Sequence, residues 1–291
     1  MHRPRNLFSR IVFPRSERIM KYLLFSLIGL LSLTLQAQDL SVISYNIRYN
    51  SSNDGADLWD LRKAELVGQL KQHAPSTFGV QEAMLVQMQY LNAELENYAY
   101  VGVGREDGDT AGEFSAIFYQ KDRFEVQQSG TFWLSETSEK VSTGWDAALP
   151  RVCTYAQFYD RKLHQSFWHF NTHFDHMGQV ARDESARLIL TKIEELTTPE
   201  DRVVVTGDFN AMPEDAPIKR MKKAMDDPLE TLNLEGPDGT FSGFKLDAPL
   251  DRRIDYIFSR NLKPRSYQHL NERRANGRFI SDHMAVKASF D

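Results

Sequence analysis

The sequence predicts an α/β protein whose sheets are largely buried. Segments with the two-residue alternation of strands are interleaved along the chain with segments of helical spacing. Residues 203–205 are three successive valines, which indicates a strand covered on both faces. No Pro-, Ser- or Gly-rich linker and no low-complexity stretch interrupts the chain, so we expect a single domain after the amino-terminal segment.

The first 37 residues have the layout of a secretory signal peptide with an upstream extension. Lys21 precedes an uncharged run over residues 22–35, and Ala37 offers a cleavage position. The run is short for a membrane span, and no cysteine follows it as in a bacterial lipoprotein. We therefore expect an exported protein, periplasmic or secreted, without a transmembrane anchor, in which residues 38–291 form one domain. An uncleaved anchor is the alternative.

Charge and cysteine content exclude several classes of protein. Residues 1–37 hold six of the 35 basic and one of the 40 acidic residues. The remaining residues, 38–291, therefore have 29 basic and 39 acidic residues and a formal net charge of −10. Such a surface repels polyanions, so no stable nucleic-acid partner is expected, although a local basic groove is compatible with it. Cys153 is the single cysteine, which rules out an internal disulfide framework and a cysteine-rich zinc site.

Strands and helices alternate in both halves of the domain. The predicted helices cover residues 58–73, 84–95 and 186–196. The predicted strands cover residues 40–47, 77–80, 100–103, 114–119, 130–134, 152–159, 165–173, 203–206, 254–258 and 285–290. Residues 152–173 are expected to form a hairpin, whereas the polar, Pro-containing region 211–245 has no predicted element.

The two halves repeat one pattern: strand, polar strand end, helix, strand, polar strand end. A sandwich of two related halves would bring all four polar ends to one rim. The candidate residues at or beside strand ends are Asn46, Glu82, Asn171, His173, Asp208, Asn210, Asp255, Asp282 and His283. If the chain stays extended past Gly207, the side chains of Asp208 and Asn210 point the same way. Loops at strand ends are where a rigid scaffold usually carries its chemistry.

Each candidate also has a purely structural interpretation. Asn210 could form an Asx-turn and cap the following helix, and Asn46 could satisfy a backbone turn. Glu82 could be the acidic residue that a helix dipole favours at its start. Asp255 could form an ordinary ion pair with the arginines at 252–253. A lone histidine is more often a hydrogen-bonded core residue than a catalyst, but the gathering of the whole set at strand ends favours function.

This combination of side chains suits the hydrolysis of a phosphate ester. Carboxylate and amide oxygens without thiolates prefer hard cations such as Mg²⁺ or Mn²⁺. Glu82 is the best anchor for such a cation, with Asn46 close by, and the metal would neutralise phosphate charge.

The remaining candidates have roles in the attack on phosphorus. Asp208 with Asn210 is suited to activate a water molecule. His283, held by Asp255, could donate to the phosphate oxygens. No Ser, Cys or Thr has the neighbours of a covalent nucleophile, so direct attack by water is expected.

Six ordered motifs resemble those of the endonuclease/exonuclease/phosphatase superfamily. They are Ser44-Tyr45-Asn46-Ile47, Val80-Gln81-Glu82, Asn171-Thr172-His173, Thr206-Gly207-Asp208-Phe209-Asn210, Arg253-Ile254-Asp255-Tyr256-Ile257 and Ser281-Asp282-His283. The resemblance implies a four-layer α/β sandwich of two packed sheets flanked by helices. It further implies a divalent metal at Asn46 and Glu82 with Asp282 nearby, and phosphate contacts from Asn171 and His173. Arg151 lies in a region that resembles a phosphate-contacting position, with a plain surface arginine as the alternative.

The resemblance does not fix the substrate. The Asn-Thr-His motif is more similar to deadenylase and sphingomyelinase-like branches than to abasic-site repair enzymes, some of which carry an acid where this chain has Arg48. The substrate is expected to be a small molecule, a lipid head group or a short nucleic acid, and a phosphodiester is favoured. A phosphomonoester of a small metabolite or sugar is the alternative, and a closed pocket bordered by residues 105–112 would favour it. A catalytically silent phosphate-binding module on the same fold is the third hypothesis.

Overall fold

The computed structural model describes residues 39–234 and 239–291, so the predicted signal peptide lies outside the described residues. The helical elements are η1 (Gly55–Asp57), α2 (Trp59–His73), α3 (Leu85–Glu94), α4 (Gln179–Leu196), α5 (Ala216–Ala224) and α6 (Pro228–Thr231). The strands are β1 (Leu40–Asn46), β2 (Thr77–Gln81), β3 (Tyr98–Val101), β4 (Ile117–Gln120), β5 (Phe124–Trp133), β6 (Val152–Asp160), β7 (Gln165–His173), β8 (Val203–Asp208), β9 (Asp255–Arg260), β10 (Pro264–Leu270) and β11 (Ala285–Phe290).

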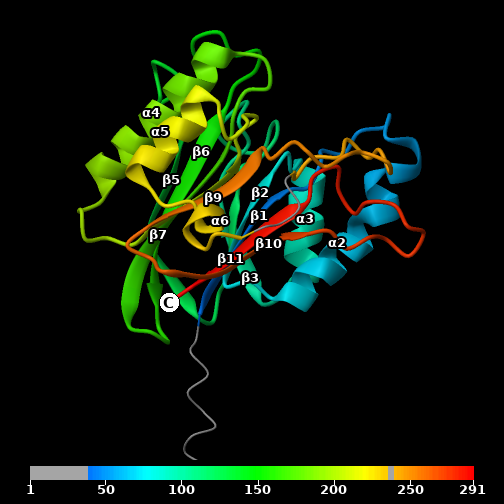
Figure 1. Cartoon of the computed structure of the whole chain (residues 1–291), viewed down its shortest axis with the longest axis horizontal. Coiled ribbons are helices and arrows are strands. Elements are labelled where there is room, and N and C mark those ends of the chain that lie inside the picture. The colour runs from blue at the N-terminus through cyan, green and yellow to red at the C-terminus, as the bar shows by residue number, and fades with distance from the viewer. Residues whose placement is uncertain (1–38, 235–238) are drawn as a thin grey trace, which may run out of the picture. The chain divides into compact units, whose positions relative to one another are not determined.

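Two β-sheets pack against each other and carry helices on their outer faces (Figure 1). One sheet has the strand order β10-β11-β1-β2-β4-β3, and the other has the order β5-β6-β7-β8-β9. Helices α2 and α3 cover the first sheet, and α4 and α5 cover the second. This arrangement confirms the four-layer α/β sandwich.

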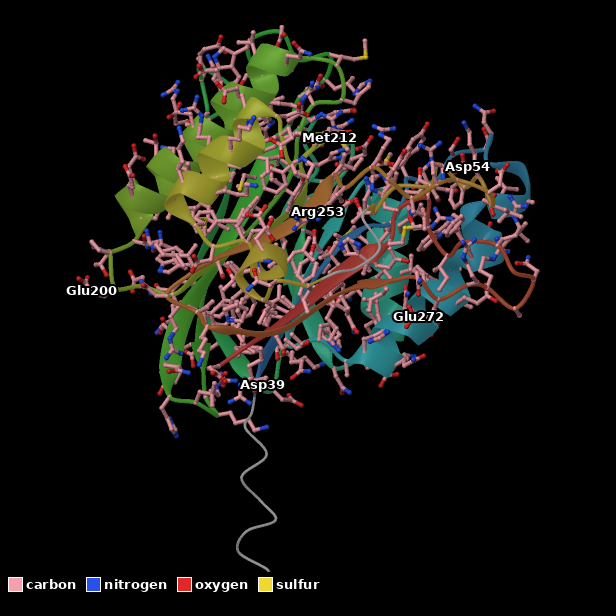
Figure 2. All side chains as sticks on the ribbon, in the orientation of Figure 1. Asp39, Asp54, Glu200, Met212, Arg253 and Glu272 are labelled. Carbon is pink, nitrogen blue, oxygen red and sulfur yellow. The ribbon has the colours of Figure 1, made fainter. Side chains whose placement is uncertain are left out.

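The two halves of the fold share one strand pattern, as the sequence predicts. Strands β1 and β2 are parallel and joined by α2, while β7 and β8 are parallel and joined by α4. Each parallel pair lies between two antiparallel neighbours. In Figure 2 the loops after β1 and β8, labelled at Asp54 and Met212, lie on the side opposite Asp39 and Glu200, which precede these strands. The carboxyl ends of the parallel strands therefore share one rim.

Several elements differ from the sequence-based expectation. Strand β5 begins at Phe124, and α5, α6 and β10 were not predicted. The first half of β5 and the middle of β10 are largely exposed, so their apolar alternation is weak. Helix α5 has Pro217 near its start and few apolar positions on its inner face. No helix among the described residues is long and apolar enough to cross a membrane.

The space between the sheets changes in chemistry along the strands. At the amino ends of the parallel strands it is filled by apolar side chains such as Val42 and Val204. On β8 the side chains that point into this space are Val204, then Thr206, then Asp208. On the neighbouring strand β7 the last side chain that points into it is His173. The interior thus passes from apolar to neutral polar to charged toward the rim, and the fold places its candidate chemistry at the charged end.

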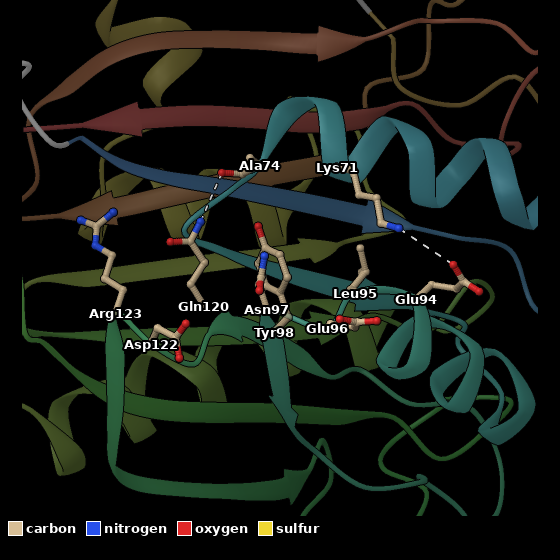
Figure 3. A pocket seen from close by; sticks show the side chains of 10 residues that line it. All are labelled: Lys71, Ala74, Glu94, Leu95, Glu96, Asn97, Tyr98, Gln120, Asp122 and Arg123. Atoms are coloured by element: carbon tan, nitrogen blue, oxygen red, sulfur yellow. Dashed lines mark hydrogen bonds and ion pairs between the residues drawn. The ribbon is translucent and has the colours of Figure 1, made fainter.

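A cavity of about 760 Å³ lies at the other end of β2, between α2, α3 and the turn after β4 (Figure 3). Several of its polar groups are engaged within the chain: the Tyr98 hydroxyl donates to the Pro75 carbonyl at 2.6 Å, and Lys71 lies 3.9 Å from Glu94. The side chains that line it are mostly exposed, and none of the candidate residues is among them. This cavity is therefore separate from the candidate site.

Candidate active site

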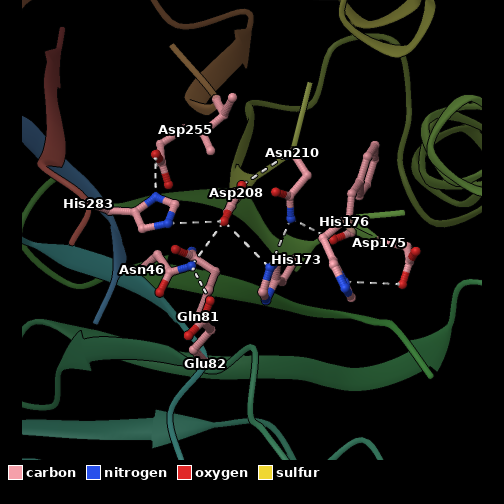
Figure 4. Close-up of polar contacts among 12 residues, drawn as sticks. Asn46, Gln81, Glu82, His173, Asp175, His176, Asp208, Asn210, Asp255 and His283 are labelled. Atoms are coloured by element: carbon pink, nitrogen blue, oxygen red, sulfur yellow. Dashed lines mark hydrogen bonds and ion pairs between the residues drawn. The ribbon is translucent and has the colours of Figure 1, made fainter. Parts of the chain in front are cut away.

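Asn46 joins the two sheets at the rim. Its Nδ2 donates to Glu82 Oε1 at 3.0 Å and to Asp208 Oδ2 at 2.9 Å, while its Oδ1 accepts from the backbone N–H of Arg48 at 3.0 Å. Asn46 ends β1 and Glu82 follows β2, whereas Asp208 ends β8 of the other sheet. Figure 4 shows Asp208 between Asn46, His283 and His173. Residues far apart in the sequence thus meet at one point.

The backbone around this point adopts unfavourable conformations. Arg48, Glu82 and Asn210 have φ angles of 58°, 62° and 45°, in the left-handed region that side-chain-bearing residues rarely enter. Each such residue costs on the order of 1 kcal/mol and persists only where surrounding contacts hold it. For Glu82 one of those contacts is a hydrogen bond from the Tyr49 N–H to Oε2 at 3.1 Å. Three of the ten non-glycine residues with positive φ in the described part of the chain therefore lie where the candidate side chains converge.

Asp255 and His283 form the pair that the sequence predicts. His283 Nδ1 lies 2.8 Å from Asp255 Oδ2, and His283 Nε2 faces Asp208 Oδ2 at 3.7 Å. Asp255 and Asp208 are register partners on β9 and β8. The alternative of an ion pair between Asp255 and a neighbouring arginine is not observed, because Arg253 binds Asp227 at 2.7 Å.

Negative charge is crowded at the rim. Burial, followed by the nearby Asp255 carboxylate, raises the pKa of Asp208 to about 7. Burial and then Glu82 raise the pKa of Asp282 to about 6. Burial lowers the pKa of His283, but the carboxylates of Asp255 and Asp208 outweigh it and hold that pKa well above its ordinary value. The site has more carboxylates than its own cations neutralise.

These residues fit a hard divalent cation. Two sets of ligand atoms lie within 4.8 Å of one another among the described residues: one from Glu82, His173 and Asp208, the other from Asp208, Asp255 and His283. The first set is the one that suits a cation, because the protonated His283 of the second has no free lone pair to offer. Carboxylate oxygens dominate both sets, as Mg²⁺ and Mn²⁺ prefer. Asn46 presents its amino group to the carboxylates, so in this geometry it orients Glu82 and Asp208.

The turn after β8 corrects one expectation. The chain does not stay extended, because Asp208 Oδ1 accepts a hydrogen bond from the Asn210 N–H at 2.9 Å and closes an Asx-type turn. The Asn210 side-chain Nδ2 instead donates to the Phe174 carbonyl at 3.0 Å and to His173 Nε2 at 3.2 Å. Asn210 also caps no helix, since α5 begins only at Ala216. Asp208 and Asn210 still meet, but through the turn.

His173 is neutral and linked to both sides of the site. Burial, together with the cations of Arg151 and Arg105, lowers its pKa well below the ordinary value. Its Nε2 lies 3.5 Å from Asp208 Oδ2, and its Nδ1 lies 3.7 Å from Glu113 Oε2. Because Asn210 Nδ2 donates to Nε2, the ring proton belongs on Nδ1, facing Glu113.

Two buried arginines flank His173 on the side away from His283. Arg151 Nε donates to Asp175 Oδ2 at 3.3 Å, and its Nη2 contacts His176 Nδ1 at 3.0 Å. Arg151 is only 4% exposed, so it is not the plain surface arginine of the alternative interpretation. Arg105 holds both oxygens of Glu113, at 2.8 and 2.9 Å.

Asn171 does not lie where a substrate phosphate could reach it. It is fully buried, and its Nδ2 donates to the carbonyls of Val80 and Ala116 at 2.9 and 3.0 Å. Its Oδ1 accepts from Gln81 Nε2 at 2.7 Å and from Thr206 Oγ1 at 2.9 Å. Its amide has no hydrogen-bonding capacity left, which corrects the expected phosphate contact. Asn171 ties the two sheets together beneath the rim.

Three residues of this region escape sequence-based reasoning. Thr240 donates to Asp255 Oδ2 at 2.6 Å from the region without a predicted element. Arg105 and Glu113 border the loop flagged as a possible pocket wall, but an acid in a Gly-rich loop has no signature of its own. Only the tertiary structure brings these three to the site.

Comparisons with known proteins agree with the geometry. The family model described as "Endonuclease/Exonuclease/phosphatase family" matches residues 43–283. A Bacteroides vulgatus endonuclease/exonuclease/phosphatase is 36% identical, with a TM-score of 0.82 over 87% of this chain and 99% of that chain. A mannosyl-6-phosphatase of Bacteroides thetaiotaomicron is 35% identical, with the same TM-score and coverage.

More distant proteins share the fold. The human Nocturnin catalytic domain, solved with a bound sulfate anion, is 19% identical with a TM-score of 0.71 over 87% of this chain and 94% of that chain. An uncharacterised protein of Acanthamoeba polyphaga mimivirus is 23% identical over 80% of this chain and 92% of its own. With the family model spanning nearly the whole described part, the chain belongs to the endonuclease/exonuclease/phosphatase family and is a phosphoric ester hydrolase.

Proposed function

We propose that the protein is an exported, divalent-metal-dependent phosphomonoesterase that acts on a small phosphorylated molecule such as a sugar phosphate. The observation that carries the choice of a small monoester is the wall beside His173. This proposal departs from the phosphodiester favoured by sequence. The 35% identity with a mannosyl-6-phosphatase supports the departure.

The wall is built from the loop between β3 and β4. Gly104 and Ala83 both form β-bridges with Phe114, which attaches the loop to the end of β2. Within the loop the Gly104 N–H donates to the Asp109 carbonyl at 2.9 Å, and Trp133 Nε1 donates to the Arg105 carbonyl at 2.8 Å. These contacts hold the loop that carries Arg105 and Glu113 in a fixed position beside His173. We take this ordered loop as a boundary that suits a small substrate better than a long polymer.

The metal would be held by Glu82 and Asp282 with help from Asp208, and it would neutralise charge on the substrate phosphate. Arg48 lies 4.0 Å from carboxylate oxygens of both Glu82 and Asp282, and this contact with a positive charge supports a cation at the same corner. Mg²⁺ or Mn²⁺ is the cation we propose, because the donors are oxygens.

The protein side chains divide the remaining chemistry. Asp208 takes a proton from the attacking water, and the turn to Asn210 fixes the direction of its carboxylate. His283, kept protonated by Asp255, donates to a phosphate oxygen as negative charge develops. On the opposite side of Asp208, His173 stays neutral with its ring proton on Nδ1, and Arg151 adds positive charge near it.

The proposed export rests on the amino-terminal sequence. A basic start, an apolar run and a small-residue cleavage position are typical of a secretory signal. Expression of the full chain with a cytoplasmic and a periplasmic marker checks it. We expect activity in the exported fraction and a mature amino terminus at Gln38; a full-length product that stays in the cytoplasm would contradict it.

Hydrolysis assays with the purified protein test the proposed reaction. The substrates are p-nitrophenyl phosphate, bis(p-nitrophenyl) phosphate, mannose 6-phosphate, a short RNA and glycerophosphocholine, each with Mg²⁺, Mn²⁺ or EDTA. Glu82→Gln and Asp208→Asn are the test variants. Glu214→Gln is the matched control, because the Glu214 side chain is 85% exposed and its one ion pair among the described residues is with Lys219.

We expect metal-dependent release of phosphate from monoesters, lost in both test variants and retained in the control. Preference for the diester or for RNA would overturn the monoester proposal and restore the hypothesis favoured by sequence. Phosphate binding without turnover on any substrate would instead support the silent binding module.

A further inference from the structure

We infer that Thr240 is a positioning residue for catalysis, which fixes the Asp255 carboxylate against His283 and turns the predicted pair into a Thr240-Asp255-His283 relay. This inference rests on the proposed function of His283. Thr240 lies 15 residues before Asp255, in a stretch with no regular secondary structure.

The hydrogen bonds of the Thr240 hydroxyl leave its proton one destination. Thr240 Oγ1 accepts from the backbone N–H groups of Ile254 and Asp255, both at 3.1 Å. A hydroxyl has one proton, and with its lone pairs engaged by these two donors that proton points to Asp255 Oδ2 at 2.6 Å. The donor is therefore assigned by the surrounding backbone.

Asp255 Oδ2 consequently receives two donors. One is the Thr240 hydroxyl and the other is His283 Nδ1 at 2.8 Å, so the carboxylate is held in the plane that faces the imidazole. Asp255 Oδ1 is buried and has no hydrogen-bond partner among the described residues. Without the Thr240 hydroxyl, the one hydrogen bond left to hold the Asp255 carboxylate is the bond to His283, and His283 is the residue that this carboxylate has to orient.

The residues after Thr240 hold the other partners of the relay. Phe241 forms a β-bridge with His283, and its ring packs edge-on against the imidazole with centroids 4.9 Å apart. Ser242 donates to the Asp282 carbonyl through its N–H at 2.8 Å and its hydroxyl at 2.9 Å. We call residues 240–242 the 240–242 strap. The strap contacts Asp255, Asp282 and His283, although Asp255 and His283 lie 28 residues apart in the sequence.

The strap is anchored independently of the side chains it positions. The Thr240 N–H donates to the Arg252 carbonyl at 2.7 Å, and the Thr240 carbonyl accepts from the Met284 N–H at 2.7 Å. These bonds fix the backbone of Thr240 whatever its side chain. Replacing only the hydroxyl should therefore change the orientation of Asp255 with little change in the path of the chain.

The test compares Thr240→Val, which removes the hydroxyl at nearly constant shape, with Thr240→Ser, which restores it. We expect kcat to fall about 10- to 100-fold in Thr240→Val with little change in KM, and to return within about threefold of wild type in Thr240→Ser. Thr77→Val is the matched control, because it removes a buried hydroxyl that contacts His169 at 3.1 Å away from the rim.

Two further readouts separate positioning from a loss of folding. In a double-mutant cycle, Thr240→Val should have no further effect on kcat in an Asp255→Ala background, because the hydroxyl acts through that carboxylate. By proton NMR, the hydrogen-bonded Nδ1 proton of His283 should shift in Thr240→Val and recover in Thr240→Ser, whether or not the protein turns over a substrate.

Several outcomes would overturn the inference. They are wild-type kcat in Thr240→Val, an equal loss in the Asp255→Ala background, or an unshifted Nδ1 proton. An inactive wild type with the expected NMR shift would contradict the proposed function while leaving the contact between Thr240 and Asp255 in place.

Discussion

Two buried polar layers lie between the sheets, and they differ in charge. The middle layer contains Thr77, Gln81, His169, Asn171 and Thr206, all neutral side chains. Gln81 bonds to Asn171 and Thr77 to His169 across the sheets, and Thr206 joins His169 and Asn171 within the second sheet. The rim layer lies beyond it, at the carboxyl ends of β1, β2 and β8, and contains Asn46, Glu82, Asp208, Asp255 and His283. The same scaffold therefore holds a neutral layer that ties the sheets together and a charged layer that carries the proposed chemistry.

Hydrogen bonds fix the tautomer of His169 in the middle layer. Thr206 Oγ1 donates to Asn171 Oδ1, so His169 Nε2 must donate to Thr206 and His169 Nδ1 accepts from Thr77. Burial lowers the pKa of His169 to about 3 and keeps the ring neutral. In the rim layer the pKa of Asp208 is raised to about 7. A neutral, paired layer stabilises the fold, whereas a crowded acidic layer costs stability unless a cation is bound.

The largest expected effect comes from Asp208→Asn. Removing the proposed base should lower kcat about 10²- to 10⁴-fold. In EDTA the variant should unfold at the same temperature as wild type or higher, because a buried carboxylate with repelling neighbours is replaced by a neutral amide. Phosphate release and thermal unfolding of the same sample check both points; a large loss of stability would mean that Asp208 belongs with the cohesive layer.

Asn171→Ala should have the opposite profile. Four hydrogen-bonding groups on Val80, Ala116, Gln81 and Thr206 would lose their partner, so the free energy of unfolding should fall by about 2–4 kcal/mol. KM of the folded variant should stay within about threefold of wild type. Urea unfolding measures the free energy of unfolding, and kinetics at low temperature measure KM. A strongly raised KM with normal stability would restore the phosphate contact implied by the family resemblance.

Gly79→Ala tests how tightly the middle layer is packed. An added Cβ would lie 2.2 Å from Asn171 Oδ1 and 2.4 Å from Thr206 Oγ1, and neither can move without breaking its bonds. We expect a loss of about 1–3 kcal/mol in urea unfolding. Gly68→Ala on α2 meets nothing within 4 Å and should instead stabilise by about 0.5–1 kcal/mol. Equal effects at the two glycines would argue against a packed polar layer.

The smallest effects concern pH, and the two layers should differ in sign. His169 has a folded pKa of about 3 against an ordinary 6.5, so the unfolded chain binds a proton that the folded protein does not, and stability falls as pH drops from about 6.5 to 3. Asp208 has a folded pKa of about 7 against 3.8, so its contribution to stability falls as pH rises from about 4 to 7.

Unfolding of two variants in EDTA between pH 4 and 7 separates these terms. His169→Gln should flatten the loss of stability toward acid, and Asp208→Asn should flatten the loss toward neutral pH. Parallel pH profiles for the two variants would show that the layers do not differ in this way.

The sequence predicts the rim layer better than the middle layer. Alternation along β7 correctly sets Asn171 and His173 on one face, and the motif order identifies the pairing of His283 with Asp255. The alternation indicates which side chains share a face of the strand, but it does not indicate how deeply each side chain is buried between the sheets. Asn171 is buried because Gly79 and Gln81 of the other sheet approach it, and no pattern within β7 reports a contact 90 residues away.

The second limit on sequence-based prediction is that segments without strand or helix periodicity give no signal for where their side chains lie. Thr240 reaches the site from a stretch that is neither helix nor strand, and its importance appears only when its hydroxyl is seen between two backbone donors and Asp255. The turn at Asn210 is similar, because Gly207 permits either an extended or a folded continuation. The contact with Asp208 Oδ1 selects the turn.

The most direct test of the account is thermal unfolding of the wild type, Glu82→Gln and Glu214→Gln during titration with Mg²⁺ or Mn²⁺. If the rim layer is an acidic site completed by a divalent cation, the metal should raise the unfolding temperature of the wild type and of Glu214→Gln. Glu82→Gln should show a much smaller rise. An unfolding temperature of the wild type that does not respond to either metal at millimolar concentration, or an equal rise in all three proteins, would contradict the account.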